Sequence, residues 1–260
     1  MRVAVVQTNP QFGQVRANIK AAIALMEKET ADLYVLPELF NTGYNFVSVE
    51  EMQNLAEPAD GPTCSAMSDF ARRKSCHIVF GFAEQADRIY NSSLLVGPHG
   101  TVGLFRKIHL FSRETLFFAP GNLGFPVFDL PQGKVGMMIC FDWIYPESAR
   151  TLALHGAQLI AHPSNLVMPY CPDAMVTRCI ENRVFAATCN RVGREDRGGV
   201  DLSYIGKSEI VSPRGEILKR LPDTGEGIAV SELHLAQATS KRVNEYNDLL
   251  AGRRPDQYAQ

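Results

Sequence analysis

The segment KVGMMICFDWIYPES, residues 134–148, has the pattern of a buried strand that leads directly into a helix. Residues 135–139 are apolar or glycine, a run typical of a strand that is covered on both faces. Pro146 is well placed to begin the helix, which we expect to end near residue 155. A buried strand joined to a helix is the repeating unit of α/β proteins, so this segment predicts an α/β fold.

The alternation of strands and helices continues in both directions from this segment. Ahead of it, apolar residues at helical spacing predict a helix over residues 14–28. Thr63 is predicted to cap a second helix, which would pack inward through Met67 and Phe70. After the segment, residues 174–184 predict another helix. The remaining predicted strands are residues 2–7, 33–36, 78–84, 91–96, 102–106, 159–161 and 186–192.

Each half of the chain closes with a similar hairpin. The sequences YNSSLLVGPHGTVGLFR, residues 90–106, and YIGKSEIVSPRGEILKR, residues 204–220, carry Pro and Gly at matching turn positions. Two similar halves predict two sheets packed face to face with helices outside, a four-layer α-β-β-α sandwich. A single doubly wound sheet is the alternative that the periodicity leaves open.

No long Pro, Gly or Ser linker divides the 260 residues, so we expect a single domain over residues 1–260. Residues 234–260 are polar and include the pair Arg253 and Arg254. We expect this end of the chain to form a surface helix and tail that takes part in subunit contact.

The bulk composition bears on the class of partner. Charge is nearly balanced, with 26 Lys and Arg against 28 Asp and Glu, so neither nucleic acid nor a membrane surface is expected as a partner. The six cysteines include no CxxC pair, and the six histidines show no metal-binding spacing. No apolar run is long enough to span a membrane, and the apolar start of the chain is too short for a signal peptide. We therefore expect free thiols, no metal, no cofactor and a cytoplasmic location.

Three reactive side chains each follow a predicted strand: Glu38, Lys107 and Cys140. Taken alone, each has an ordinary explanation. Buried cysteines are usually inert, a loop glutamate is usually solvated, and a lysine in apolar surroundings usually extends to water. Because strand ends in α/β folds meet at one edge of a sheet, the three together predict a catalytic site.

The three residue types suit nucleophilic catalysis at a carbonyl carbon. A thiol with an ordinary pKa near 8.5 is only a few per cent ionised at neutral pH, so it needs a base or a cation nearby. Glu38 can accept the proton, and Lys107 can stabilise both the thiolate and the oxyanion that forms on attack. The backbone N–H of Phe141 is the expected second oxyanion donor.

These segments resemble the nitrilase, or carbon–nitrogen hydrolase, superfamily and its Glu-Lys-Cys triad. The resemblance implies an α-β-β-α sandwich that pairs into homodimers or larger assemblies. It implies that Cys140 attacks an amide or nitrile carbon while Glu38 acts as base and then as acid, and that Lys107 stabilises the intermediates. The matching segments are LPE at residues 36–38, RKIHL at 106–110, ICFDWIYPE at 139–147, AHPSN at 161–165 and RCIENR at 178–183.

The same resemblance points to further site residues. Glu114 matches a second glutamate of the family and is expected to hold Lys107 or the substrate. Tyr44, Trp143 and Asn165 are expected near the nucleophile as substrate-binding residues, although both aromatic residues could equally belong to the core.

Several activities share this triad. Many nitrilases have Cys-Trp-Glu at the nucleophile, whereas this chain has CFDW at residues 140–143, which favours an amidase for small aliphatic amides. A small aliphatic nitrilase, an N-carbamoyl hydrolase and an acyltransferase remain alternatives. Two further hypotheses are a Cys-His enzyme with His162 as the base, and a binding scaffold without activity.

Overall fold

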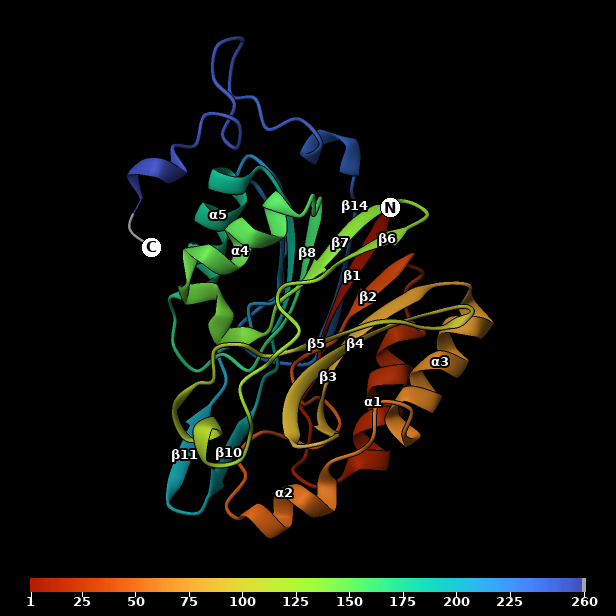
Figure 1. The fold of residues 1–260 in the computed structure, drawn as a ribbon. Helices are drawn as coiled ribbons and strands as arrows, with labels where there is room; N and C mark the ends of the chain where they lie inside the picture. Colours follow the sequence, from red (N-terminus) through yellow and green to blue (C-terminus); the bar gives the residue numbers. More distant parts are fainter. Residues whose placement is uncertain (259–260) are drawn as a thin grey trace.

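Two six-stranded sheets form the centre of the computed structural model, which describes residues 1–258 (Figure 1). The first sheet has the order β14 (Gly227–Glu232), β1 (Arg2–Gln7), β2 (Leu33–Val35), β3 (His77–Gln85), β4 (Ile89–Gly97) and β5 (Gly100–Arg106). The second has the order β6 (Val127–Leu130), β7 (Gly133–Met137), β8 (Leu159–Pro163), β9 (Phe185–Cys189), β12 (Glu209–Val211) and β13 (Ile217–Arg220).

The two sheets repeat one topology. In each, three strands run parallel, β1-β2-β3 in one and β7-β8-β9 in the other, and an antiparallel hairpin follows them. An antiparallel strand also flanks the first parallel strand, β14 beside β1 and β6 beside β7. Because the loops after the parallel strands leave the same end of each sheet, they bring polar residues from distant parts of the chain together.

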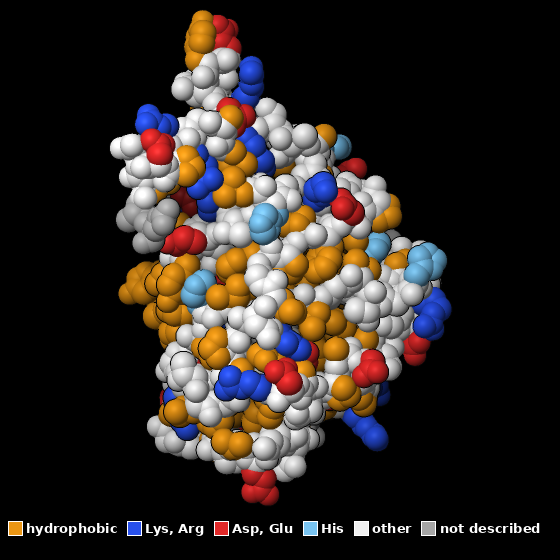
Figure 2. Space-filling model, in the orientation of Figure 1, with side chains coloured by type: hydrophobic (Ala, Val, Ile, Leu, Met, Phe, Trp, Pro, Cys, Tyr) orange, Lys and Arg blue, Asp and Glu red, His pale blue; other side chains and the backbone are white. Residues whose placement is uncertain are grey.

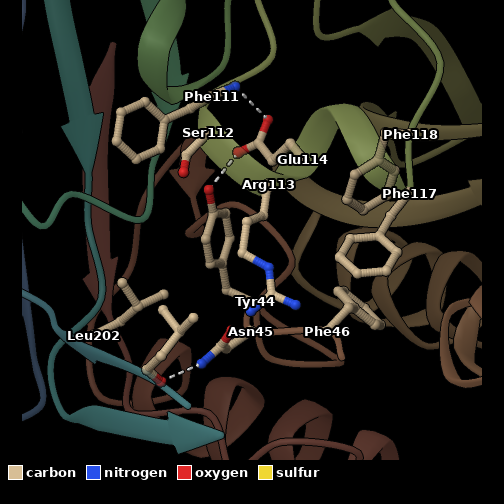
Figure 3. A pocket seen from close by; sticks show the side chains of 11 residues that line it. Tyr44, Asn45, Phe46, Phe111, Ser112, Arg113, Glu114, Phe117, Phe118 and Leu202 are labelled. Carbon is tan, nitrogen blue, oxygen red and sulfur yellow. Dashed lines mark hydrogen bonds between the residues drawn. The ribbon is translucent and has the colours of Figure 1, made fainter. Parts of the chain in front are cut away.

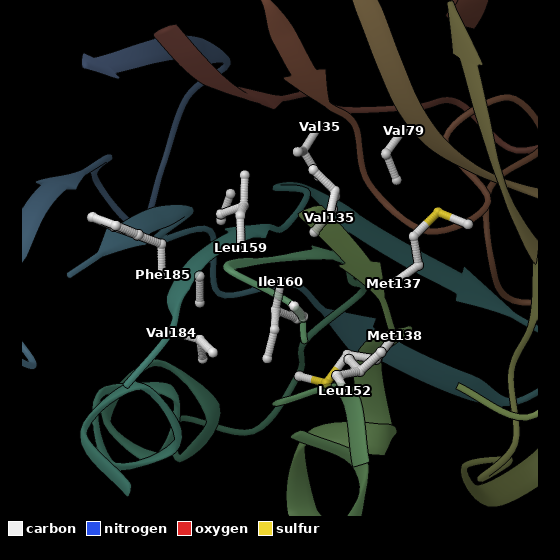
Figure 4. Close-up of a cluster of buried hydrophobic side chains, with 14 of the residues drawn as sticks. Val35, Val79, Val135, Met137, Met138, Leu152, Leu159, Ile160, Val184 and Phe185 are labelled. Carbon is white, nitrogen blue, oxygen red and sulfur yellow. The ribbon is translucent and has the colours of Figure 1, made fainter. Parts of the chain in front are cut away.

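Helices cover the outer faces of the two sheets (Figure 1). Helices α1 (Val15–Met26) and α3 (Pro62–Lys74) lie against the first sheet, and α4 (Pro146–Leu154) and α5 (Cys171–Asn182) lie against the second. The sheets face each other across an apolar core, in which Val35 and Val79 of the first meet Val135, Met137 and Leu159 of the second (Figure 4). The predicted α-β-β-α sandwich is confirmed.

Most predicted elements are present, with bounds that differ by a few residues. The sequence reading did not anticipate α2 (Val49–Leu55), β6, β14 or the short hairpin of β10 (Arg194–Arg197) and β11 (Val200–Ser203). The structure also has single-turn 3-10 helices η1 (Ser112–Leu116), η2 (Cys140–Ile144), η3 (Leu235–Ala238) and η4 (Pro255–Gln257). No helix within residues 1–258 is both long and apolar enough to cross a lipid bilayer.

Two predictions about helices were wrong. Thr63 does not cap α3, because Pro62 already occupies the first turn and Gly61 is the N-cap residue. The Glu57 carboxylate accepts hydrogen bonds from the backbone N–H of Thr63, at 2.7 Å, and from its hydroxyl, at 2.9 Å. The Glu57 carboxylate thus satisfies the Thr63 N–H in the first turn of α3, as the side chain of a cap residue would.

The expected surface helix in residues 234–260 is also absent from the part described, up to residue 258, where only η3 and η4 form. Side chains here bond to nearby backbone instead. Asn244 Oδ1 accepts from the N–H groups of Tyr246 and Asn247, and Asp248 Oδ1 accepts from those of Leu250 and Ala251. Such local bonds compete with a helix and favour successive turns.

Candidate active site

Glu38 lies in a tight turn just beyond the end of β2. The turn packs directly onto β3, where a Cβ atom on Gly81 would lie 2.5 Å from Glu38 Cα. Only glycine permits this close approach, and Leu39, with φ of 48°, takes the left-handed conformation that turns the chain back. Glu38 has no solvent-exposed surface, so its carboxylate is fixed inside the protein.

Cys140 occupies a second tight turn, where the chain leaves β7 and enters η2. Its φ is 40°, in the left-handed region that is rare for residues other than glycine. Asp142 holds this turn, because its carboxylate accepts hydrogen bonds from the N–H of Ile139 at 3.0 Å and from the N–H of His109 at 3.0 Å. One carboxylate therefore ties the cysteine turn to the segment that carries Lys107.

Lys107 is the centre of a buried charged group, which we call the reaction cluster: Glu38, Lys107 and Glu114. Lys107 Nζ donates to Glu38 Oε1 at 2.7 Å and to Glu114 Oε1 at 2.6 Å. Asn91 Nδ2 also donates to Glu38 Oε1, at 2.6 Å, and the Tyr44 hydroxyl donates to Glu114 Oε1 at 2.6 Å. Glu38 Oε2 is buried and has no hydrogen-bond partner among the described residues.

Burial and mutual charge shift the pKa values at this site. Burial raises the pKa of the Cys140 thiol well above its ordinary range, and Glu38 raises it further, against an opposing effect of Lys107. Burial alone would lower the pKa of Lys107, but Glu114 and Glu38 raise it overall. Burial raises the pKa of Glu114 to about 7. These shifts favour a charged Lys107 and a protonated Cys140 thiol in the resting site.

A small, partly open cavity lies beside the cysteine. Asn165 lines it with both polar side-chain atoms buried and, within residues 1–258, without hydrogen-bond partners. An unpaired buried amide costs about 1–3 kcal/mol, so this position suits a ligand that bonds to it. The other lining residues are Phe111, Cys140, Phe141, Trp143, Leu166, Val167 and Met168.

A second pocket adjoins the reaction cluster (Figure 3). Phe111 lines both cavities. The ring of Tyr44 forms a wall of the second pocket, and its hydroxyl points to Glu114. The two cavities thus lie on either side of groups that belong to the same site.

The residues singled out from the sequence converge on this region. Glu38, Lys107 and Glu114 bond directly, and the charges of all three act on Cys140. Tyr44 bonds to this cluster, while Phe141, Trp143 and Asn165 line the cavity at the thiol. The sequence analysis assigned no role to Asn91 or Asp142. Asn91 had no distinct signal, because Ser92 and Ser93 beside it are also polar, whereas Asp142 stands within the CFDW segment that carries the nucleophile.

His162 does not fit the role of base for the cysteine. Its Nε2 lies 2.9 Å from the backbone oxygen of Cys140, and its Nδ1 lies 3.1 Å from Thr188 Oγ1. Both ring nitrogens are therefore committed to structural bonds, and burial lowers the pKa of His162 to about 4. The His162 ring therefore bonds to the backbone of the turn that carries Cys140 and stabilises that turn.

Comparison with known proteins gives a consistent result. The sequence profile of the family described as carbon-nitrogen hydrolase matches residues 2–243. A protein from Pyrococcus abyssi named nitrilase is 50% identical over 99% of both chains, and an (R)-stereoselective amidase from a Pseudomonas species is 36% identical over 84% of this chain and 80% of its own. The solved structure of a mutant of the amidase from Nesterenkonia sp. AN1, which shows the Michael addition of acrylamide at its active-site cysteine, has a TM-score of 0.77 at 26% identity. The match covers 91% of this chain and 95% of that one.

Proposed function

The chain belongs to the carbon–nitrogen hydrolase family, and on that premise we propose that it hydrolyses small aliphatic amides through a thioester on Cys140. The observation that carries the proposal is the free oxygen of Glu38. Glu38 Oε1 accepts from Lys107 and Asn91, whereas the buried Oε2 has no partner within residues 1–258. A buried acceptor without a donor beside a protonated thiol suits a general base.

In the first step, Cys140 Sγ attacks the amide carbon and its proton passes to Glu38. The carbonyl oxygen becomes an oxyanion, which needs donors that are already in place. Lys107 carries three N–H donors, of which two bond to Glu38 and Glu114, so one is left for this oxygen. The backbone N–H of Phe141, next to the nucleophile, serves as the second donor.

In the second step, the tetrahedral intermediate collapses. The carbon–nitrogen bond breaks, the nitrogen takes the proton from Glu38, and ammonia leaves a thioester on Cys140. Water then enters, gives a proton back to Glu38 and attacks the thioester carbon. Release of the carboxylic acid returns the proton to the sulfur, so Glu38 ends the cycle as it began.

The cavity at the thiol supplies the contacts expected for a small amide. Asn165 can bond to the substrate through its unpartnered oxygen and nitrogen. Trp143, which is 7% exposed, and Leu166 give the cavity an apolar wall suited to an aliphatic chain.

A nitrile is the second candidate substrate, supported by the Pyrococcus abyssi relative named nitrilase. The same thiol would add to the nitrile carbon to give a thioimidate, and a first water would release ammonia and leave the thioester. Carbamoyl substrates, and amines as acceptors in place of water, would use the same three residues. Amides are preferred because the nucleophile segment is CFDW rather than Cys-Trp-Glu.

The test is ammonia release from aliphatic amides, nitriles and carbamoyl compounds by the intact protein and by Cys140→Ala. Cys64→Ala, which alters a buried cysteine of α3, is the matched control. Turnover of amides that Cys140→Ala abolishes and Cys64→Ala keeps is the expected result. Turnover of nitriles alone would replace the amide proposal, and hydroxamate formation with added hydroxylamine would reveal acyl transfer.

We also propose that the protein is a cytoplasmic homodimer or larger assembly. Exposed apolar side chains gather near α4 and α5, including Ile144, Tyr145, Tyr170 and Ile180, and apolar surface is visible beside α4 (Figure 2). Burying such a patch against a second copy would remove it from water. Sedimentation of the intact protein and of Tyr170→Asp tests this: a dimer that the substitution weakens is expected, and a monomer in both would contradict it.

A further inference from the structure

The pocket beyond Tyr44, which we call the Arg113 pocket, combines apolar walls with one cationic side chain. Phe46, Phe117, Phe118 and Leu202 form most of the wall, and the Arg113 side chain extends between Tyr44 and Phe117 (Figure 3). Arg113 is partly exposed, so its guanidinium can be reached from the pocket.

Within residues 1–258 the Arg113 guanidinium has neither a hydrogen bond nor an ion pair. The nearby Arg197, in contrast, pairs with Glu51 at 2.5 Å. Glu114, the sequence neighbour of Arg113, cannot serve as a partner, because its Oε1 accepts from Lys107 and Tyr44 and its Oε2 accepts from the Phe111 N–H at 3.1 Å. Arg113 therefore keeps five N–H donors for something that enters the pocket.

The Arg113 pocket adjoins the cavity at the thiol. Phe111 lines both the Arg113 pocket and the cavity that contains Cys140, so a ligand can run past its ring from one to the other. The Tyr44 hydroxyl bonds to Glu114 of the reaction cluster, while its ring lines the Arg113 pocket. A flexible chain with its reacting carbon at the thiol would thus place its far end near Arg113.

The charges of the reaction cluster and of Arg113 determine which chemical group can stand at the far end of the substrate. The reaction cluster has two carboxylates for one lysine, so an anion close to Cys140 would be repelled. An anion at the far end of an apolar chain avoids this repulsion and meets the planar guanidinium fork, which matches a carboxylate with two parallel hydrogen bonds. A terminal ammonium would be repelled by Arg113.

We propose that Arg113 binds the carboxylate of a substrate that carries its amide at the other end, so that the substrates are monoamides of aliphatic dicarboxylic acids. The inference rests on the amide hydrolysis proposed above and names the substrate class of that site. The apolar walls contact the methylene groups between the two ends.

The experiment measures binding by calorimetry to the Cys140→Ala protein, in which no turnover occurs. The ligands are succinamate, glutaramate and adipamate, each compared with the neutral amide of equal chain length. We expect the carboxylates to bind roughly 10- to 100-fold more tightly, because bonds between charged groups are worth about twice those between neutral groups. Arg113→Gln should remove this ratio, and Arg214→Gln, at an exposed hairpin turn, should keep it.

Reversing the charge at position 113 gives a second test, and a misfolded protein would not produce the result expected from it. In the same Cys140→Ala background, Arg113→Glu should reverse the order, so that 4-aminobutanamide binds more tightly than succinamate, while Arg113→Lys should keep part of the preference for carboxylates. Equal binding of carboxylates and neutral amides, or a preference that survives Arg113→Gln, would overturn the proposal. Failure of the intact protein to release ammonia from any amide would instead overturn the proposed function, which separates the two outcomes.

Discussion

Two buried charged clusters lie on either side of Tyr44, and they differ in how fully their hydrogen bonds are satisfied. The reaction cluster holds Lys107 between Glu38 and Glu114, and the other, which we call the Arg191 cluster, pairs Arg191 with Glu195. All these side chains are buried, with exposed fractions between 0% and 5%. Burial of charge alone does not distinguish a catalytic cluster from a structural one.

The difference lies in the unused hydrogen-bonding capacity. In the Arg191 cluster, Glu195 accepts from Arg191, from the N–H of Asn45 at 2.7 Å and from the Tyr204 hydroxyl at 3.3 Å, and the Arg191 guanidinium lies 4.0 Å from the Tyr204 ring centre. The reaction cluster leaves Glu38 Oε2 without a donor. A fully satisfied buried pair fixes the fold, whereas a spare acceptor beside a thiol can move a proton.

The largest effect is expected from Glu38→Gln, which removes the spare acceptor. The amide has no basic oxygen, so kcat/KM for amides should fall by roughly 10²- to 10⁴-fold. Lys107 keeps Glu114 as a partner, so the free energy of unfolding should change little. Steady-state ammonia release and urea unfolding measure the two effects, and an active Glu38→Gln protein would show that another group is the base.

Glu195→Gln should give the opposite pattern. It leaves the buried charge of Arg191 uncompensated, which typically costs about 3–5 kcal/mol of unfolding free energy. Once folded, the protein should keep most of its amide turnover, because Glu195 does not bond to the reaction cluster. Urea unfolding followed by fluorescence measures the stability. If Glu195→Gln lost as much activity as Glu38→Gln but no stability, the two clusters would not differ in the way described.

A smaller effect is expected from Glu114→Gln, and it depends on pH. The pKa of Glu114 is raised from 4.5 to about 7, so between these values the folded protein holds a proton that the unfolded chain releases. This contribution is fully present below pH 4.5 and is lost as the pH rises through about 7. The stability of the unaltered protein relative to Glu114→Gln should therefore fall by about 1–3 kcal/mol between roughly pH 5 and roughly pH 8.

Urea unfolding of both proteins at the two pH values measures this difference directly. Subtracting the variant removes the contribution of Glu209, whose pKa burial also raises to about 7. A difference that stays constant or grows with pH would mean that Glu114 is ionised throughout the range.

The smallest effect is expected from Tyr44→Phe. Tyr44 bonds to both clusters, and this substitution removes only its bond to the reaction cluster. The hydroxyl bonds to Glu114 at 2.6 Å, while the backbone N–H that bonds to Glu195 is kept. Glu114 Oε1 still accepts from Lys107, so loss of this one bond should cost only about 0.5–1.5 kcal/mol, seen as a decrease in kcat/KM. Kinetics with a neutral amide measures it, and a loss equal to that of Glu38→Gln would assign Tyr44 a larger part.

The sequence alone predicted the sandwich because its halves repeat at the level of strand, helix and hairpin. Buried parallel strands such as β7 and β8 are largely apolar, and such runs are a strong signal in a sequence. β14 and the β10–β11 hairpin were not predicted, because their residues are half-exposed and mixed in polarity. The end of the chain was mistaken for a helix because local side-chain bonds, as at Asn244 and Asp248, decided its conformation.

For the site, residue types at strand ends predicted Glu38, Lys107 and Cys140 together. The Arg191 cluster was not predicted although Arg191 and Glu195 are an i,i+4 pair. Glu195 also bonds to Tyr44 and Asn45, which are distant in sequence, and no local pattern marks such contacts. Whether a buried carboxylate has a spare oxygen depends on the packing of side chains from several strands. That distinction, which separates the two clusters, required the folded structure.

The most direct test is the covalent intermediate itself. The protein is mixed with an aliphatic amide, quenched in acid during turnover and measured by intact mass and peptide mapping. The account predicts an added acyl group, the amide less ammonia, on the peptide that contains Cys140, and none in Cys140→Ala. Ammonia release without an acyl group on any cysteine, or an acyl group on one of the other five, would contradict it.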